Sequence, residues 1–173
     1  MIKPFVVLPD GKIREKSQEV AAFDESLRKL IADLIDTAIA QTDPPALGLA
    51  APQINVFKRV FIARIRNKFK PFVNPRITKY SKVQTALLEG CFSISGIYGQ
   101  VTRPAEITVE AQDKRGKRMV STYKGVAAKI IQHELDHLKG ILFIDHVHEQ
   151  NGKLFRIEKG QDGKEQMVEE EYA

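Results

Sequence analysis

The chain has 173 residues, of which 43% are hydrophobic, and this is enough to bury the core of one domain. Its formal net charge of +5 permits a polyanionic partner, but so modest a surplus is more typical of an ordinary charged surface than of specific nucleic-acid binding. No apolar run is long enough to span a bilayer, and the first residues are interrupted by proline too soon for a signal peptide. We therefore expect a cytoplasmic protein with neither a membrane nor a specific nucleic-acid partner.

The first predicted helix follows Asp24, a residue type that favours the N-cap position. Apolar residues then recur at helical spacing from Leu27 to Ala38, and the pattern stops before the proline pair at 44–45. This periodicity predicts an amphipathic helix with one face on the core.

Two stretches further along the chain predict strands. Residues 56–65 are rich in valine, isoleucine and phenylalanine, and residues 105–111 alternate between polar and apolar side chains. The turn sequence at 113–116 ends in glycine, so the strand after it is expected to return antiparallel to the strand before it.

A second helix is predicted from Val126 to Leu138, with Gly140 just beyond its end. It is apolar on nearly every side, as expected for a buried element, yet it carries the motif His-Glu-x-x-His at positions 133–137. Histidines four residues apart lie above one another on a helix, so His133 and His137 can bind one metal ion together. Such a pair needs a third ligand.

Cys91 is the only cysteine of the chain, so it cannot form an internal disulfide. In a reducing compartment its thiol is a metal ligand, a nucleophile or a packed core residue. It lies in a segment of small residues between Glu89 and Ser93, where Gly90 lets the backbone approach closely. Together with the two histidines it suggests a metal-dependent hydrolase.

At this point the sequence resembles the peptide deformylases, whose three motifs occur here in the family order. The family patterns are Gly-x-Gly-φ-Ala-Ala-x-Gln, Glu-Gly-Cys-Leu-Ser and Gln-His-Glu-x-Asp-His. The matching segments are Ala46–Gln53, Glu89–Ser93 and Gln132–His137. The resemblance covers about residues 5 to 147. It implies an α+β fold with antiparallel-rich sheets around a central helix that bears the His-Glu-x-x-His motif.

The domain expectation follows from the extent of this resemblance. Residues 1–150 are expected to form the catalytic domain. Residues 151–173 are expected to form a C-terminal extension that is acidic at its end and partly disordered.

The resemblance implies removal of the formyl group from the N-terminal formyl-methionine of nascent polypeptides, with release of formate. Cys91, His133 and His137 would hold one divalent metal ion, with water in the open fourth position. The family typically uses Fe²⁺, and Zn²⁺, Ni²⁺ or Co²⁺ can substitute. Glu134 would serve as base and then as acid. The Gln53 side chain and the Phe92 backbone N–H would stabilise the oxyanion.

The resemblance also assigns substrate contacts and supporting residues. The substrate backbone would pair with an edge of the protein as an added strand, and the methionine side chain would enter an apolar pocket. The substrate-binding candidates are Leu47, Gly48, Leu87, Gly90, Val126 and Ile130. Residues that orient the metal ligands are expected to be Glu89, Arg103 and Asp136. Lys129 is expected near the pocket rim, in contact with either substrate or solvent.

The partner implied is an N-formylmethionyl nascent peptide, which emerges at the ribosome. A transient association with the ribosome is therefore conceivable. A bacterial or phage-encoded cytoplasmic protein is favoured over an organellar one.

Three positions depart from the family pattern. Ala46 stands where glycine is usual, Phe92 where leucine is usual, and Ser95 where proline is common. Ala46 would be strained if that position needs a positive φ, and Phe92 adds bulk beside the metal.

Two rival functions share parts of this pattern. A zinc endopeptidase would take its third ligand from a downstream residue such as His146 or His148. A catalytically silent binding module would explain the departures at Ala46 and Phe92.

Overall fold

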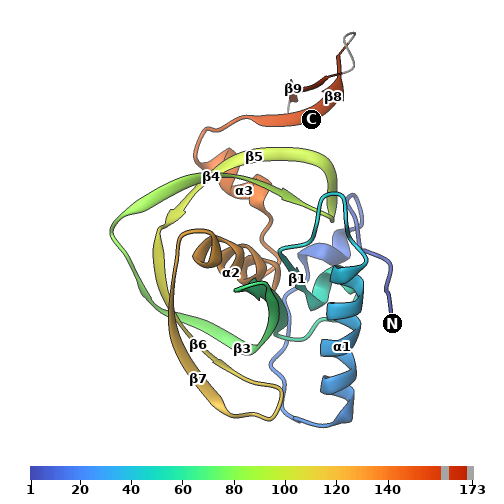
Figure 1. Cartoon of the computed structure of the whole chain (residues 1–173), viewed down its shortest axis with the longest axis vertical. Helices are drawn as coiled ribbons and strands as arrows, with labels where there is room; N and C mark the ends of the chain where they lie inside the picture. The colour runs from blue at the N-terminus through green and yellow to red at the C-terminus, as the bar shows by residue number, and fades with distance from the viewer. Residues whose placement is uncertain (161–163, 171–173) are drawn as a thin grey trace.

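The computed structural model describes residues 1–160 and 164–170, and its two antiparallel sheets enclose one central helix. Helix α2 lies between the sheets and α1 flanks the first of them (Figure 1). The five-stranded sheet has the order β1-β2-β3-β6-β7, and the four-stranded sheet has the order β4-β5-β8-β9. The predicted α+β class is confirmed. The strands are β1 Gly48–Ala50, β2 Val60–Ile65, β3 Lys68–Tyr80, β4 Gln84–Cys91, β5 Ile94–Pro104, β6 Glu106–Gln112, β7 Arg118–Lys124, β8 Leu154–Lys159 and β9 Glu165–Glu170. The helices are η1 Gly11–Arg14, α1 Glu25–Ile39, η2 Ala51–Ile54, α2 Gly125–His137 and α3 Phe143–Glu149.

Helix α1 begins where its sequence predicts. The Asp24 side chain accepts a hydrogen bond from the Leu27 N–H at 3.2 Å and thereby caps the first turn. The apolar face of α1 packs with Leu49 and Ile62 of the first sheet in one buried cluster. This cluster holds the short strand β1 in place next to the site described below. Among the described residues, no helix has the length and apolar character needed to cross a bilayer.

Helix α2 agrees with its prediction to within one residue at each end. Its buried face packs with Phe61 and Phe72, whose rings stack at 4.9 Å on the first sheet. The helix ends before Gly140, which has φ +75 and lies against the backbone of Arg14. Glycine is needed there because an L side chain rarely adopts a positive φ.

The close approach at Gly140 gives a stability prediction. A Cβ at Gly140 would lie 2.0 Å from the Arg14 carbonyl oxygen, so Gly140→Ala combines a clash with a strained backbone. We expect the free energy of unfolding to fall by about 3 kcal/mol, measured by urea denaturation. Gly11→Ala is the control, since a Cβ there would meet nothing within 4 Å. Equal stability of the two variants would contradict this account of the helix end.

The hairpin predicted around residues 113–116 is present between β6 and β7. The Asp113 carboxylate accepts hydrogen bonds from the N–H groups of Arg115 and Lys117 and closes the turn. The strand predicted over residues 56–65 is shorter than expected, because β2 begins at Val60. The segment before it forms an isolated bridge between Lys58 and Gln18 instead of joining the sheet.

The C-terminal segment forms a hairpin. Strand β8 pairs with β5 at Ile97–Gly99, and β9 pairs with β8 along its whole length. The hairpin extends beyond the rest of the molecule (Figure 1). The expected disorder at the very end of the chain falls on residues 171–173, outside the described residues.

Candidate functional site

Three of the predicted ligands come together at the junction of the second sheet and the central helix. Cys91 is the last residue of β4, and His133 and His137 lie one turn apart on α2. Their ligand atoms lie within 4.8 Å of one another, and Cys91 Sγ is 3.3 Å from His137 Nε2. One sulfur and two imidazole nitrogens suit a first-row divalent metal such as iron or zinc.

The charges around this group favour metal binding. Although burial disfavours a thiolate, the adjacent His137 and His133 rings lower the pKa of Cys91 well below its usual value. Burial alone would also lower the pKa of His133, but its contacts with Cys91 and Glu89 raise it well above the usual value. The Cys91 thiolate is thus favoured, and so is a positive charge next to it. A divalent ion bound at this position would supply that positive charge.

Glu134 lies beside the ligands in a buried position. A Cβ on Gly48 would come within 2.4 Å of Glu134 Oε1, so only glycine leaves room for this carboxylate next to β1. Its Oε2 atom is buried and has no hydrogen-bond partner among the described residues. Burial raises the pKa of Glu134 to about 7, against the opposing effect of the two histidines. A carboxyl group of this kind can exchange a proton near neutral pH.

Gln53 is buried at 2% exposure, so its position is not that of a surface amide in a turn. Its Oε1 atom accepts a hydrogen bond from the Ala50 N–H at 2.9 Å, which fixes the amide orientation. Its Nε2 group then faces Cys91 Sγ at 3.3 Å and Ser93 Oγ at 3.4 Å. Ser93, whose part in holding Gln53 the sequence did not suggest, is fully buried.

Phe92 follows Cys91 and its ring stacks on Phe5, with centroids 5.2 Å apart and an interplanar angle of 8°. The backbone after Phe5 also forms hydrogen bonds with the segments that contain Gln53 and Ser93. The Val6 N–H donates to the Gln53 carbonyl at 2.8 Å, and the Leu8 N–H donates to the Ser93 carbonyl at 2.9 Å. The Phe92 ring, which is larger than the leucine usual at this position, therefore packs on the N-terminal segment. The same segment forms hydrogen bonds with Gln53 and Ser93.

The other two departures from the family pattern are also accommodated. Ala46 is not among the residues with positive φ, so the backbone strain considered above is absent. Its side chain is 2% exposed and packs in the core cluster with α1. Ser95 lies on the rim of the cavity described next.

A cavity of about 330 Å³ opens beside Cys91, His133 and Glu134. It is lined by residues of β1, β4, β5 and α2, and both β1 and β4 are edge strands of their sheets. All the predicted substrate-binding residues line it: Leu47, Gly48, Leu87, Gly90, Val126 and Ile130.

Lys129 is buried and does not reach solvent. Its side chain is 4% exposed, and its ammonium donates to the carbonyl oxygens of Thr85 on β4 and Val101 on β5, the second at 3.1 Å. Lys129 therefore links α2 to the sheet that carries Cys91, and it also lines the cavity.

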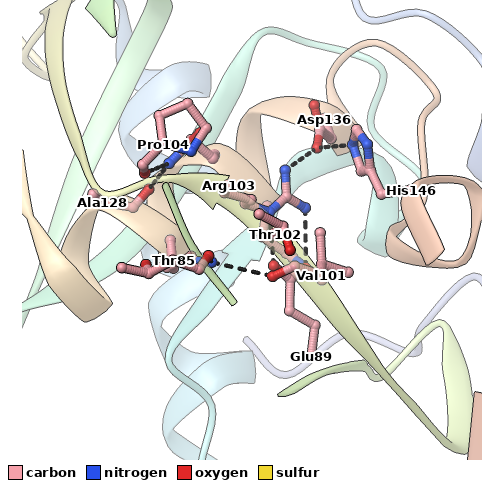
Figure 2. A network of polar contacts seen from close by, with 12 residues as sticks. Thr85, Glu89, Val101, Thr102, Arg103, Pro104, Ala128, Asp136 and His146 are labelled. Atoms are coloured by element: carbon pink, nitrogen blue, oxygen red, sulfur yellow. Dashed lines mark hydrogen bonds and ion pairs between the residues drawn. The ribbon is translucent and has the colours of Figure 1, made fainter. Parts of the chain in front are cut away.

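A buried network of ion pairs and hydrogen bonds connects Glu89, Arg103, Asp136 and His146 next to His133. Figure 2 shows these four residues. Glu89 accepts two hydrogen bonds from the Arg103 guanidinium, at 2.7 and 3.0 Å, and contacts His133 Nδ1 at 2.8 Å. Arg103 also donates to Asp136 at 2.7 Å, and Asp136 contacts His146 Nε2 at 2.8 Å. Because His133 Nδ1 is engaged by Glu89, its Nε2 atom is left for the metal.

This network predicts that Arg103 is needed for stability. Arg103→Met would leave Glu89 and Asp136 buried without their shared cation, and we expect unfolding to become easier by about 3–5 kcal/mol in urea denaturation. The metal content should fall as well, because Glu89, which contacts His133, would no longer be held by Arg103. Arg118→Met is the control, because Arg118 pairs with Glu110 at the surface and such pairs contribute about 0–1 kcal/mol. Unchanged stability, metal content and activity in Arg103→Met would exclude the supporting role.

His146, one of the two residues that the endopeptidase hypothesis offers as a downstream ligand, contacts a carboxylate instead. Its Nε2 atom contacts Asp136, and it is absent from the group of residues that could share an ion. Cys91 occupies the third position that an endopeptidase would fill from downstream. This contact could not be predicted from the sequence, because Asp136 and His146 lie on two different helices, α2 and α3, with a connection between them.

Comparisons with known proteins agree with this geometry. A family model described as polypeptide deformylase matches residues 2–153. The peptide deformylase of Rhizobium meliloti (strain 1021) is 39% identical over 151 residues, which cover 84% of this chain and 85% of the relative. The crystal structure of peptide deformylase from Thermotoga maritima matches with a TM-score of 0.80 and 34% identity, over 84% of this chain and 97% of the other. A Met-Ala-Ser-bound peptide deformylase from Acinetobacter baumannii matches with a TM-score of 0.79 and 28% identity, over 84% and 98%. This chain therefore belongs to the polypeptide deformylase family, hydrolases that remove the N-terminal formyl group from nascent polypeptides.

Proposed function

We propose that deformylation in this protein depends on one divalent ion held by Cys91, His133 and His137, and that the ion is Fe²⁺, with Zn²⁺, Ni²⁺ or Co²⁺ able to replace it. The proposal is carried by the convergence of these three ligand atoms within 4.8 Å, with Glu134 beside them. When bound, such an ion supplies a Lewis acid that polarises an oxygen and acidifies water.

Glu134 is assigned the proton transfers. Its carboxylate accepts a proton from the water that attacks the formyl carbon. When the carbon–nitrogen bond breaks, the same carboxyl group gives the proton to the departing amine, so formate and a free N-terminus are formed. The raised pKa near 7 suits both directions of transfer.

The Gln53 amide and the Phe92 backbone N–H are assigned to the oxygen that becomes negatively charged during attack. Gln53 Nε2 already faces the cysteine sulfur, and its orientation is fixed through Ala50. Loss of one such donor typically lowers kcat by about 10²–10³-fold. The packing of Phe5 on Phe92 would keep the second donor in place.

The substrate is assigned to the cavity. Strand β1 has β2 on one side only, so its free edge at Leu47 and Gly48 can pair with an extended peptide. Leu87, Val126 and Ile130 would receive the methionine side chain. Gly90 would let the peptide pass close to β4. The Met-Ala-Ser tripeptide bound to the Acinetobacter baumannii relative supports this class of ligand.

The cellular setting is also part of the proposal. Residues 1–150 would act as the catalytic domain and residues 151–173 as an appended segment. The protein would work in the cytoplasm of a bacterium or of a phage-infected cell and meet its substrate during a transient association with the ribosome. The similarity to bacterial relatives supports this setting.

The test is formate release from formyl-Met-Ala-Ser by protein loaded anaerobically with Fe²⁺ or Ni²⁺. We expect formate and a free amine from the formyl peptide, and no free amine from acetyl-Met-Ala-Ser, because the extra methyl group makes its acyl group larger. Absence of release by a folded, metal-loaded protein would reject the proposed roles and favour the silent binding module.

A further inference from the structure

One face of the four-stranded sheet carries an apolar stripe formed by Tyr98 and Phe155, which are half-buried, and by Ile157 and Met167, which are exposed. Tyr98 on β5 lies directly opposite Phe155 on β8, and Ile157 lies directly opposite Met167 on β9. Side chains two residues apart on a strand share a face, so Phe155 and Ile157 continue one another. Ile157 is 40% and Met167 is 49% exposed. The stripe therefore runs from β5 onto the hairpin of β8 and β9, which projects from the rest of the molecule in Figure 1.

Near β5 the opposite face of this sheet is covered. Val101 and Leu154 are buried there together with Phe143 and Val147 of α3. The apolar stripe lies on the face that α3 does not cover. Exposed contiguous apolar surface on a soluble protein commonly marks a binding site.

The apolar stripe is continuous with the substrate cavity. Tyr98 lines the cavity, as does Leu88, which is 50% exposed on β4. A Cβ on Gly90 would lie 2.7 Å from Tyr98 Cε1, so the tyrosine ring lies over Gly90 at the free edge of β4. The cavity and the stripe thus meet at Tyr98.

We propose that the apolar stripe binds the part of the peptide substrate that follows its first residues, so that formylated chains with apolar downstream residues are preferred. This inference rests on the proposed function. An extended tripeptide spans about 10 Å, which is sufficient for the cavity alone. Neighbouring strands are about 4.8 Å apart, so crossing from Tyr98 on β5 to Met167 on β9 takes roughly three further residues. Peptides of about ten residues would therefore reach the whole stripe.

The charges at the border of the stripe favour an unfolded chain as its occupant. Lys153 pairs with Glu169 at 2.8 Å beside the stripe, so this ion pair adds no net charge. The outer strand β9 also carries Glu165, and Glu170, which pairs with Arg156; charged side chains on an edge strand oppose pairing with a second copy of the same edge. An extended apolar segment laid across the face meets neither obstacle.

The experiment compares three formylated peptides that all begin with Met-Ala-Ser. The first is the tripeptide. The second and third have ten residues, with leucine and phenylalanine or with serine and glycine at positions four to seven, the positions that would cross the stripe. We expect kcat/KM for the apolar ten-residue peptide to exceed the other two by roughly tenfold, the effect of partly burying two or three apolar side chains.

Two matched variants locate the effect. Ile157→Ser with Met167→Ser removes the exposed half of the stripe, and we expect it to abolish the tenfold preference while leaving the tripeptide unaffected. Glu158→Ser with Gln166→Ser is the control, since these residues also lie opposite one another but on the other face of the hairpin. The control should keep the preference.

The outcomes are distinguishable from failure of the proposed function. Turnover of the tripeptide with equal kcat/KM for all three peptides would overturn the inference and leave the proposed function intact. Loss of the preference in both double variants would assign it to hairpin stability and overturn it as well. A concentration-dependent dimer that only the Ile157/Met167 variant disrupts, without any dependence on peptide, would show that a second copy occupies the stripe.

Discussion

Replacing Glu134 with glutamine is expected to lower kcat for formyl-Met-Ala-Ser by about 10³-fold, within the range that a positioned acid or base contributes. Glutamine has nearly the same shape, so it fits the space that Gly48 leaves beside β1. It cannot accept the proton of the attacking water, and it has none of suitable acidity to give to the amine. Formate release in the steady state measures the loss.

Metal content separates this effect from damage to the site. The ligands Cys91, His133 and His137 are untouched, so Glu134→Gln protein should carry as much metal as the unaltered protein, measured by elemental analysis after gel filtration. KM should change much less than kcat, because the group acts on the reacting atoms. Full activity with full metal content would remove Glu134 from the mechanism.

Replacing Cys91 with alanine is the second large effect expected. It leaves two imidazoles, so we expect the protein to lose most of its metal on gel filtration and activity to fall by more than about 10³-fold, since a catalytic site of this type needs three protein ligands. The stabilisation that the ion contributes by binding the folded state should vanish too. Thermal unfolding with and without added Ni²⁺ measures this, and the shift seen in the unaltered protein should be absent.

His148→Ala is the matched test of the endopeptidase alternative. We expect this variant to keep its metal and its activity. A Cys91→Ala protein that retains metal, together with a His148→Ala protein that loses it, would instead place the third ligand downstream of the helix.

Helices α1 and α2 and the β6–β7 hairpin could be predicted because each has a strong local pattern. Asp24 caps α1, glycine ends α2, and the aspartate–glycine turn joins β6 to β7. The remaining strands lack such patterns. Strand β4 is exposed over most of its length, and β8 and β9 carry alternating charges that read as a polar tail. Their pairing is decided by partners far along the chain, and a local pattern cannot reveal it.

The group formed by Cys91, His133 and His137 could be predicted because the motifs place these residues, whereas the orientation of several neighbouring side chains could not. Helical spacing put Lys129 near the cavity but could not show its ammonium turning to the carbonyls of β4 and β5. Whether Ala46 is strained depends on its φ angle, which the sequence does not determine locally and which is not positive in the structure. The burial of Gln53 could not be predicted either, because its contacts include Val6 and Ser93, which are distant in sequence.

The N-terminal segment has a consequence for the order in which the protein folds. Its N–H groups at Val6, Leu8 and Ser17 donate to the carbonyls of Gln53, Ser93 and Leu138, which belong to three different regions of the chain. Contacts between residues so distant in sequence are slow to form, because each closes a long loop whose entropy must be lost first. Gln53 and Phe92 would thus reach their final alignment late in folding, after α2 has settled between the sheets.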